Sequence, residues 1–352
     1  MAAVRDHSVR FRVPRTPLIL AIIPVLFLAV DHPLTQELFL PPQETIEVLL
    51  RQSEAAADPA MPFVRDVVYH SDLLREYHLD VYGPLSGEPA TGAAAGAANG
   101  AESSAELQAP APVIIFYHGG SWLRGDKITI MVVERFLRRM REQGWFVVAV
   151  DYTTSALRGL AGPVAKARRA LEWVQDQSSV WGWDPRRVGL YGVSAGAHVA
   201  LMAAAEQGAE QEQPRPALVL AECAPVDLLE MRAGDAFEQS ASFRLFPRSH
   251  LAALSPVAHI DQRYPPTLIY HGDADTTVHV DQALLLADEL AAAGVAHDLV
   301  IYPEGGHAFL NYSTEQWYEQ ESRAIAWMAA VFRSGDPPPS SGPRPASMTL
   351  YH

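Results

Sequence analysis

Residues 187–200 read RVGLYGVSAGAHVA, and this stretch decides the fold. Its first part, Val188 to Tyr191, is typical of a short apolar strand, and the residues from Ala195 onward are typical of a helix. The join has the G-x-S-x-G pattern, in which small neighbours allow a serine to occupy a sharp strand-to-helix turn. We therefore predict that the hydroxyl of Ser194 projects beyond the carboxyl end of a sheet strand as a nucleophile.

Short apolar strands alternate with helical segments on both sides of this turn. The predicted strands are residues 64–70, 77–82, 113–117, 145–150, 188–191, 217–222, 267–270 and 298–302. The predicted helices are residues 130–143, 163–179, 195–207, 280–293 and 314–332. This alternation predicts an α/β fold with a mostly parallel central sheet, helices on both faces, and an antiparallel edge formed by the first two strands.

The composition excludes several kinds of partner and site. The 352 residues are 49% hydrophobic, which is enough for a sizeable core. A net charge of −14 without an organised basic stripe argues against nucleic acid as a partner. The single cysteine, Cys223, excludes an internal disulfide and any zinc site based on cysteines, and the thirteen histidines show no metal-ligand spacing. We expect no metal and no other cofactor, and no pattern specifies an oligomeric state.

The N-terminal region has its own composition. Residues 1–16 carry four arginines and one acid, and the apolar run 17–30 that follows has no charge. A basic flank before such a run predicts a signal or membrane anchor over residues 1–31. We therefore expect export or membrane anchoring, with the catalytic part on the periplasmic or extracellular side. The alternative is a buried N-terminal helix in a cytoplasmic protein.

Composition also divides the rest of the chain. Residues 32–62 are predicted to be a spacer, and residues 63–333 a single α/β domain. Within that domain, residues 83–112 form a Gly/Ala/Pro/Ser/Glu tract that predicts a flexible insertion. Residues 227–264 contain no clear strand and are predicted to form a small lid over the site. The Pro- and Ser-rich residues 334–352 predict a disordered tail.

The first loop with chemical potential is residues 118–122, HGGSW, which follows the strand 113–117. In open α/β sheets, ligands bind beyond the carboxyl ends of the strands. Two glycines after a strand leave backbone N–H groups free to point at a ligand. Together with the N–H of Ala195, they can bind the oxyanion of a tetrahedral intermediate.

Two later loops supply the other groups that a serine nucleophile needs. Asp273 and Asp275 follow the strand 267–270, and His307 follows the strand 298–302. A serine hydroxyl becomes nucleophilic when a base takes its proton, and that base needs a carboxylate to orient it. The order serine, acid, histidine is that of a catalytic triad, with one of the two aspartates as the acid.

Five motifs together resemble the α/β-hydrolase superfamily. They are HGGSW at 118–122, GVSAGAH at 192–198, SPVAHI at 255–260, HGDADTTV at 271–278 and EGGHAF at 304–309. Within the superfamily, the chain is most similar to the hormone-sensitive-lipase-like and feruloyl-esterase-like carboxylesterases, over roughly residues 63–333.

The resemblance implies a role for each site residue. The implied triad is Ser194 as nucleophile, Asp275 as acid and His307 as base. The implied oxyanion donors are the backbone N–H groups of Gly120, Ser121 and Ala195. The lipase-like group often has a third glycine where this chain has Ser121, but a serine keeps the backbone N–H. The H-G-G-x-W form points toward small-lid esterases and aryl formamidases.

The activity that the resemblance implies is hydrolysis of short-chain or aryl esters through an acyl-enzyme, with a small-molecule ester as substrate. Three alternatives remain open at this point. An arylformamidase needs the same residues, and a serine exopeptidase shares the G-x-S-x-G and H-G-x-x-D-x-x-V patterns. The third alternative, a non-catalytic hydrolase-fold binding protein, is disfavoured because such proteins generally lose a triad member.

Overall fold

The computed structural model describes residues 63–72, 75–85, 109–127, 129, 133–152, 160–205, 214–231, 247–309 and 311–338. The predicted anchor and spacer (1–62) lie outside these residues, as do 86–108 of the predicted insertion, 232–246 of the predicted lid and 339–352 of the predicted tail. Among the described residues, no helix combines the length and the apolar character needed to cross a membrane.

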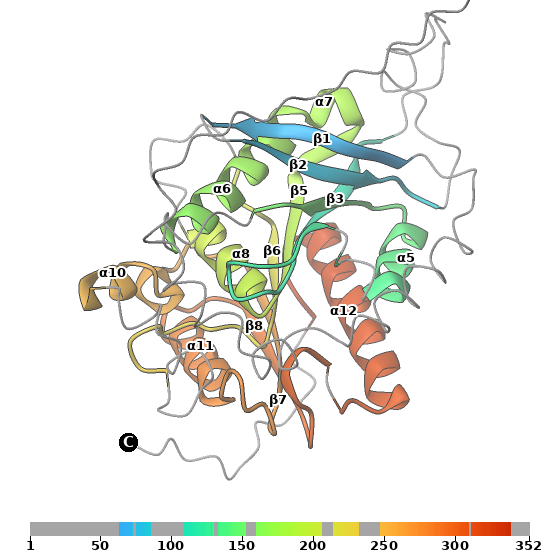
Figure 1. Ribbon diagram of the computed structural model, residues 1–352. Helices are drawn as coiled ribbons and strands as arrows, with labels where there is room; N and C mark the ends of the chain where they lie inside the picture. Colours follow the sequence, from blue (N-terminus) through green and yellow to red (C-terminus); the bar gives the residue numbers. More distant parts are fainter. Residues whose placement is uncertain are drawn as a thin grey trace, which may run out of the picture. The chain divides into compact units, whose positions relative to one another are not determined.

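Eight strands within the described residues form one sheet, in the order β1-β2-β4-β3-β5-β6-β7-β8 (Figure 1). Their bounds are β1 Phe63–Ser71, β2 Glu76–Tyr82, β3 Ala111–Tyr117, β4 Phe146–Val150, β5 Trp183–Val193, β6 Leu218–Glu222, β7 Thr267–Gly272 and β8 His297–Tyr302. β2 pairs antiparallel with both β1 and β4, and the other neighbours pair parallel. The predicted parallel sheet with an antiparallel edge is confirmed.

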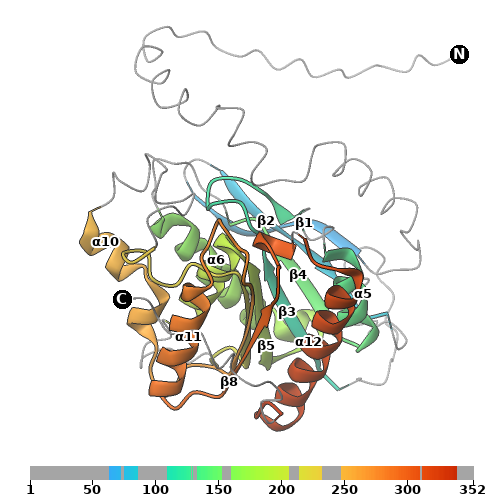
Figure 2. The same ribbon diagram turned by 90° about the horizontal axis from the view of Figure 1, so that it is seen from below.

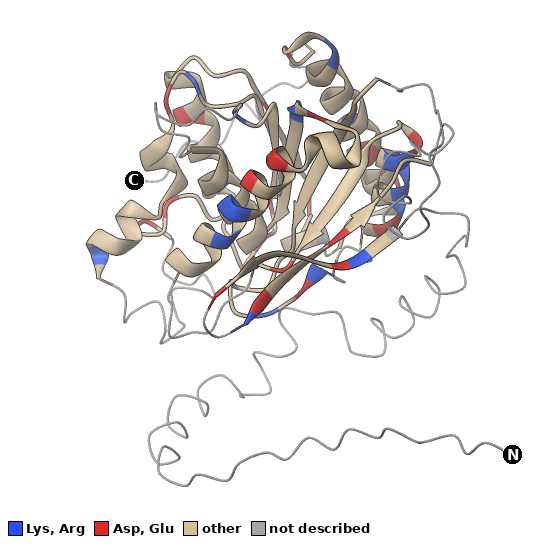
Figure 3. Cartoon of the chain, turned by 90° about the horizontal axis from the view of Figure 1, so that it is seen from above, with Lys and Arg blue, Asp and Glu red and all other residues tan. Residues whose placement is uncertain are grey.

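Helices cover both faces of this sheet, with α5 and α12 on one face and α6, α8 and α11 on the other (Figure 2). The helix bounds are α5 Glu134–Glu142, α6 Ala161–Asp176, α7 Ser178–Trp181, α8 Ala195–Ala205, α10 Arg248–Ala253, α11 Asp281–Ala292 and α12 Thr314–Ser334, with short 3-10 turns η3 Pro256–His259 and η4 His307–Phe309. Charged residues lie mainly on the helices and on the β1 and β2 edge, whereas the central strands carry few (Figure 3).

The two-sided cover explains the apolar character of the central strands. Ile114, Val147 and Leu190 are fully buried, and each contributes about 1.5–3 kcal/mol relative to an exposed position. Helix α8 is buried along almost its whole length, from Ala195 to Ala204, so it lies inside the core rather than on its surface. The turn before α8 is therefore held from all sides.

Several bounds differ from the sequence prediction: the predicted helix 163–179 is divided into α6 and α7, and two strands begin well before the predicted residues. β5 begins at Trp183 rather than Val188, because the Nε1 of the buried Trp183 donates to the carbonyl of Val174 and ties the start of the strand to α6. β3 begins at Ala111, so the last two residues of the predicted insertion are strand; the N–H of Ala111 donates to the carbonyl of Gly182. Both extensions depend on tertiary contacts that a local pattern does not contain.

Candidate active site

The turn between β5 and α8 carries Ser194, the predicted nucleophile. Ser194 has a φ of 57°, in the left-handed region that non-glycine residues rarely occupy. Its backbone N–H donates to the carbonyl of Glu222 at 2.8 Å, and its carbonyl accepts from the N–H of His198 at 3.1 Å. The residue is 4% exposed. A strained backbone held by these bonds fixes the direction of the hydroxyl.

The two glycines of the turn are required by close backbone contacts. A Cβ on Gly192 would lie 2.2 Å from the carbonyl oxygen of Gly196, and a Cβ on Gly196 would lie 2.0 Å from the carbonyl oxygen of Tyr117. Real Cβ atoms do not approach other atoms so closely. The G-x-S-x-G pattern is therefore a packing requirement at this turn.

His307, at the start of η4, lies between Ser194 and Asp275. Its Nε2 is 2.9 Å from the Oγ of Ser194, and its Nδ1 is 2.7 Å from the Oδ2 of Asp275. In the tautomer with the proton on Nδ1, the imidazole donates to the carboxylate and accepts from the serine hydroxyl. The structure thus brings together three residues from the ends of β5, β7 and β8.

Asp275 is a buried carboxylate with its charge well compensated. Its Oδ1 accepts from the backbone N–H groups of Thr277 at 2.8 Å and Val278 at 2.9 Å. Its Oδ2 faces His307 and also lies 3.3 Å from the Nε2 of His271. Burial alone raises the pKa of Asp275, but the hydrogen bonds from His271 and His307 outweigh burial and lower the pKa well below its usual value. Asp275 is therefore ionised at neutral pH.

Asp273, the other acid of this loop, is placed differently. It is exposed, and its Oδ1 accepts from the backbone N–H of Glu304 at 2.7 Å. That bond ties the loop after β7 to the loop after β8, away from the imidazole. Of the two candidate acids, the structure places Asp275 beside His307.

The loop after β3 forms a tight turn, in which the N–H groups of Leu123 and Arg124 donate to the carbonyl of Gly120. Gly120 has a φ of 125° and Ser121 a φ of 53°, and a Cβ on Gly119 would lie 3.7 Å from the Cβ of Ser194. Within the described residues, the backbone N–H groups of Gly120 and Ser121 donate to no backbone carbonyl. The N–H of Ala195, as the first residue of α8, has none inside its helix. The loop therefore comes close to the turn that carries Ser194 at Gly119.

Side chains outside the triad brace this loop. Tyr152 Oη donates to the carbonyl of His118, and the N–H of Lys127 donates to Asp151 Oδ1 at 2.7 Å. Trp122 Nε1 donates to His198 Nδ1 at 3.0 Å. These contacts place His118 and His198 in the packing around the loop.

His198 stays neutral in the folded protein. Its Nε2 lies 2.8 Å from the carbonyl oxygen of Leu254, in the described part of the predicted lid. Burial lowers the pKa of His198 to about 4, although this carbonyl opposes the shift. The imidazole therefore joins α8 to residue 254 without carrying a charge at neutral pH.

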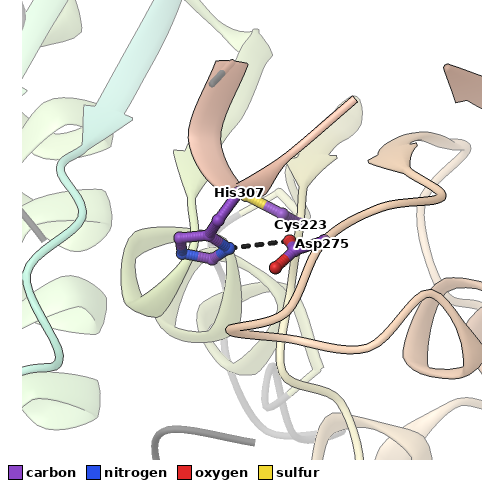
Figure 4. Close-up of side chains that lie close together, drawn as sticks. All are labelled: Cys223, Asp275 and His307. Atoms are coloured by element: carbon purple, nitrogen blue, oxygen red, sulfur yellow. Dashed lines mark hydrogen bonds and ion pairs between the residues drawn. The ribbon is translucent and has the colours of Figure 1, made fainter. Parts of the chain in front are cut away.

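Cys223 is the member of this site that sequence reasoning missed. Its side chain is buried, with 2% of its surface exposed. The structure places it next to Asp275 and His307, and one ligand atom from each of the three residues lies within 4.8 Å of the others (Figure 4). The sequence feature that could have indicated Cys223 is its position directly after the predicted strand 217–222, because the other polar residues of the site also follow strands.

Comparison with known proteins agrees with this geometry. A family model described as BD-FAE matches residues 103–290, which is more than half of the chain. The chain belongs to the BD-FAE family. The resemblance to α/β-hydrolase esterases that the motifs carry is therefore confirmed.

Curated relatives of this BD-FAE protein are named as esterases. The chain is 28% identical over 216 residues to a probable carboxylic ester hydrolase, LipM, of Mycobacterium tuberculosis, covering 56% of this chain and 48% of that protein. It is 26% identical over 223 residues to Esterase LipC of the same organism, covering 57% and 53%. It is 26% identical over 220 residues to the isoprenylcysteine alpha-carbonyl methylesterase ICME of Arabidopsis thaliana, covering 56% and 51%. The chain thus spans about half the length of these relatives.

Solved structures show the same fold. The apo form of Thermogutta terrifontis esterase 2 matches with a TM-score of 0.59 at 23% identity, over 80% of this chain and 99% of that one. A truncated carbohydrate esterase from gut microbiota matches with a TM-score of 0.60 at 19% identity, over 79% and 99%. The described domain of this BD-FAE protein is an α/β-hydrolase fold.

Proposed function

We propose that this protein is a serine carboxylesterase that hydrolyses short-chain or aryl esters. The observation that carries the proposal is the imidazole of His307, which lies 2.9 Å from the Ser194 hydroxyl and 2.7 Å from the Asp275 carboxylate. Membership of the BD-FAE family and the names of the relatives support a carboxylic ester as the substrate.

The first half of the proposed reaction forms an acyl-enzyme. The Nε2 of His307 takes the proton of the Ser194 hydroxyl as Oγ attacks the ester carbonyl carbon. The carbonyl oxygen becomes an oxyanion, which accepts hydrogen bonds from the backbone N–H groups of Gly120, Ser121 and Ala195. One such donor is commonly worth about 10²–10³ in kcat. His307 then gives its proton to the departing alcohol.

The second half repeats these steps with water as the nucleophile. His307 takes a proton from water, the resulting hydroxide attacks the acyl carbon, and Ser194 leaves with the proton returned from His307. The negative charge of Asp275 stabilises the imidazolium in both halves and holds the tautomer that accepts from the serine. Its lowered pKa keeps it ionised throughout.

Short acyl chains are proposed because the predicted lid, residues 227–264, is small and has few long apolar stretches to line a lipid tunnel. In the described part of this segment, Leu251 and Leu254 are buried. Burial in the protein interior leaves these side chains unavailable to a long acyl chain.

A substrate panel tests the proposal. We expect p-nitrophenyl acetate and butyrate to be hydrolysed faster than the palmitate, and all of them faster than formyl anilides or aminoacyl anilides, with the Ser194→Ala variant as background. A preference for formyl anilides would establish an arylformamidase instead. A preference for aminoacyl anilides would establish an exopeptidase, and no turnover of any substrate would point to a binding protein.

We also propose that residues 1–31 export or anchor the protein, so that the catalytic domain lies on the periplasmic or extracellular side. The support is the arginine-rich start followed by an uncharged apolar run.

A further inference from the structure

Cys223 follows directly after β6 and has an unusual backbone. Its φ is 42°, and its N–H donates to the carbonyl of Tyr270 on β7 at 2.8 Å. Its thiol lies against the backbone N–H groups of Ala308 and Ser194, which favour a negatively charged sulfur. The only thiol of the chain therefore lies beside the segments that carry the nucleophile and the base.

The side chains around this sulfur form a mixed set of metal donors. Cys223 offers a thiolate, Asp275 a carboxylate and His307 an imidazole, with the donor atoms no more than 4.8 Å apart (Figure 4). A point among three atoms so spaced lies within about 2.8 Å of each, whereas zinc binds sulfur at about 2.3 Å and nitrogen or oxygen at about 2.0–2.2 Å. Shifts of about 0.5–0.8 Å complete the coordination. Three protein ligands with an open fourth position are an ordinary zinc arrangement.

We propose that Cys223, Asp275 and His307 form a reversible inhibitory site for a thiophilic divalent cation, Zn²⁺ or Cd²⁺. The cation bonds to the Sγ of Cys223, and the thiol proton leaves to solvent. It also bonds to the carboxylate of Asp275 and to the Nδ1 of His307, whose proton is transferred through water to Nε2. The two positive charges are balanced by the thiolate and the carboxylate.

The proton transfer explains why binding inhibits. With its proton on Nε2, His307 can no longer accept the proton of the Ser194 hydroxyl, which lies 2.9 Å away. Asp275 at the same time loses its contact with the imidazole. The inhibition rests on the proposed esterase function, whereas the binding itself does not.

The solvent access of the three side chains and the protonation of the thiol favour a reversibly bound cation over a permanent one. His307 is 8% exposed and Cys223 2%, so solvent reaches the group from the imidazole side. Burial, followed by the charges of Asp275 and Glu222, raises the pKa of the Cys223 thiol well above its usual value. The cation therefore takes the place of the thiol proton.

Titration of the full-length protein with Cd²⁺ tests the binding. A cadmium–thiolate bond has an ultraviolet charge-transfer band, and because the chain has one cysteine this band reports Cys223 alone. We expect a saturable one-to-one band in the wild type and none in Cys223→Ser, with thermal melting to show that the variant is folded. His307→Ala should weaken the affinity at least about tenfold. The absence of a band in the wild type, or equal affinity in His307→Ala, would overturn the site.

Kinetics test the inhibition. With p-nitrophenyl acetate, Zn²⁺ should inhibit the wild type at a concentration at least about tenfold below that needed for Cys223→Ser, each compared with its own metal-free rate, and EDTA should restore the rate. Equal inhibition of Cys223→Ser refutes the proposal. A wild type without esterase activity refutes the proposed function instead, and the cadmium band then still decides the binding.

Discussion

Residues 192–196 carry the proposed nucleophile and residues 272–278 the proposed acid. These two segments, here called the nucleophile turn and the acid loop, hold Ser194 and Asp275 by different means. In the turn, backbone contacts leave no room for side chains, and Ser194 adopts a left-handed φ of 57°. In the acid loop, four hydrogen-bonding groups converge on the Asp275 carboxylate, and Asp273 two residues earlier is exposed. Close backbone packing therefore positions the Ser194 hydroxyl, whereas hydrogen bonds to its charged oxygens position the Asp275 carboxylate.

This difference determines how each region responds to change. Side chains added to the turn meet rigid backbone, so they act on stability. A change of the acid leaves the fold in place and acts on the chemistry, because it alters the tautomer of His307. The predictions below separate the two effects.

The largest effect is expected for Ser194→Ala. Removing one oxygen leaves the packing of the turn intact, so the variant should melt as the wild type does while kcat falls on the order of 10⁶. An organophosphonate should label the wild type once, at Ser194, and mass spectrometry of the labelled peptide identifies the residue. Labelling at another serine would reject the assignment of the nucleophile.

The second-largest loss of activity is expected for a substitution in the acid loop. Asp275→Asn keeps the shape but favours the wrong tautomer of His307, and kcat should fall on the order of 10⁴. Asp273→Asn is the matched control, because it changes the same atoms two residues away and should act mainly on stability. Measured kcat values for both variants decide the question. A dead Asp273→Asn beside a nearly normal Asp275→Asn would reverse the roles of the two residues.

A glycine substitution tests the steric account of the turn. In Gly196→Ala the new Cβ would lie 2.0 Å from the carbonyl oxygen of Tyr117, so the free energy of unfolding should fall by more than about 4 kcal/mol. Gly294→Ala is the control, because Gly294 has a φ of +71° but no atom within 4 Å, and only the backbone term of about 1–2 kcal/mol applies. Urea unfolding measures both. Equal losses would show that the close contact between residue 196 and the Tyr117 carbonyl relaxes at little cost and does not require glycine.

As the pH falls, the stability contributed by His198 on α8 should be lost before that contributed by Asp275 in the acid loop. The pKa of buried His198, on α8, is lowered to about 4, so the unfolded state binds its proton first as pH falls below about 6.5. Stability should therefore decrease between pH 6.5 and 4, by about 3 kcal/mol from this group. The lowered pKa of Asp275 delays its own contribution to more acidic pH. His198→Gln should flatten the dependence of the free energy of unfolding on pH in that window, and an unchanged slope would assign it to other groups.

The smallest effect is expected from removing residues 1–31, which contain neither region. The shortened protein should keep the wild-type kcat, because the turn and the acid loop both lie within the described domain. The full chain should fractionate with membranes or be exported, and the shortened one should be soluble. A full-length product that stays entirely in the cytosol would assign the apolar run to the domain.

Local sequence patterns predicted the sheet, the main helices that cover it and the three loops whose residues Ser194, Asp275 and His307 lie together. Apolar runs of strand length predict that Ser194 and His307 each follow the end of a strand. Since parallel strands of one sheet end at the same edge, the two residues are expected on the same side of the sheet. Glycine is required at positions 192 and 196 because the backbone segments come so close there that a Cβ atom does not fit. The choice between Asp273 and Asp275 was a weaker prediction. The two residues stand two positions apart in one loop, and the conformation of that loop decides which of them faces His307.

The sequence by itself thus determined the fold class and the order of serine, acid and histidine, because these depend on periodicity and on glycines within a few residues. Only the tertiary structure decided how near these groups come to each other and what else lies among them. β6 stands between β5 and β7 in the sheet, so the residue after β6, Cys223, lies between the nucleophile and the acid. That order comes from the pairing of strands far apart in the chain. No local pattern encodes it, because long-range packing selects which strands become neighbours.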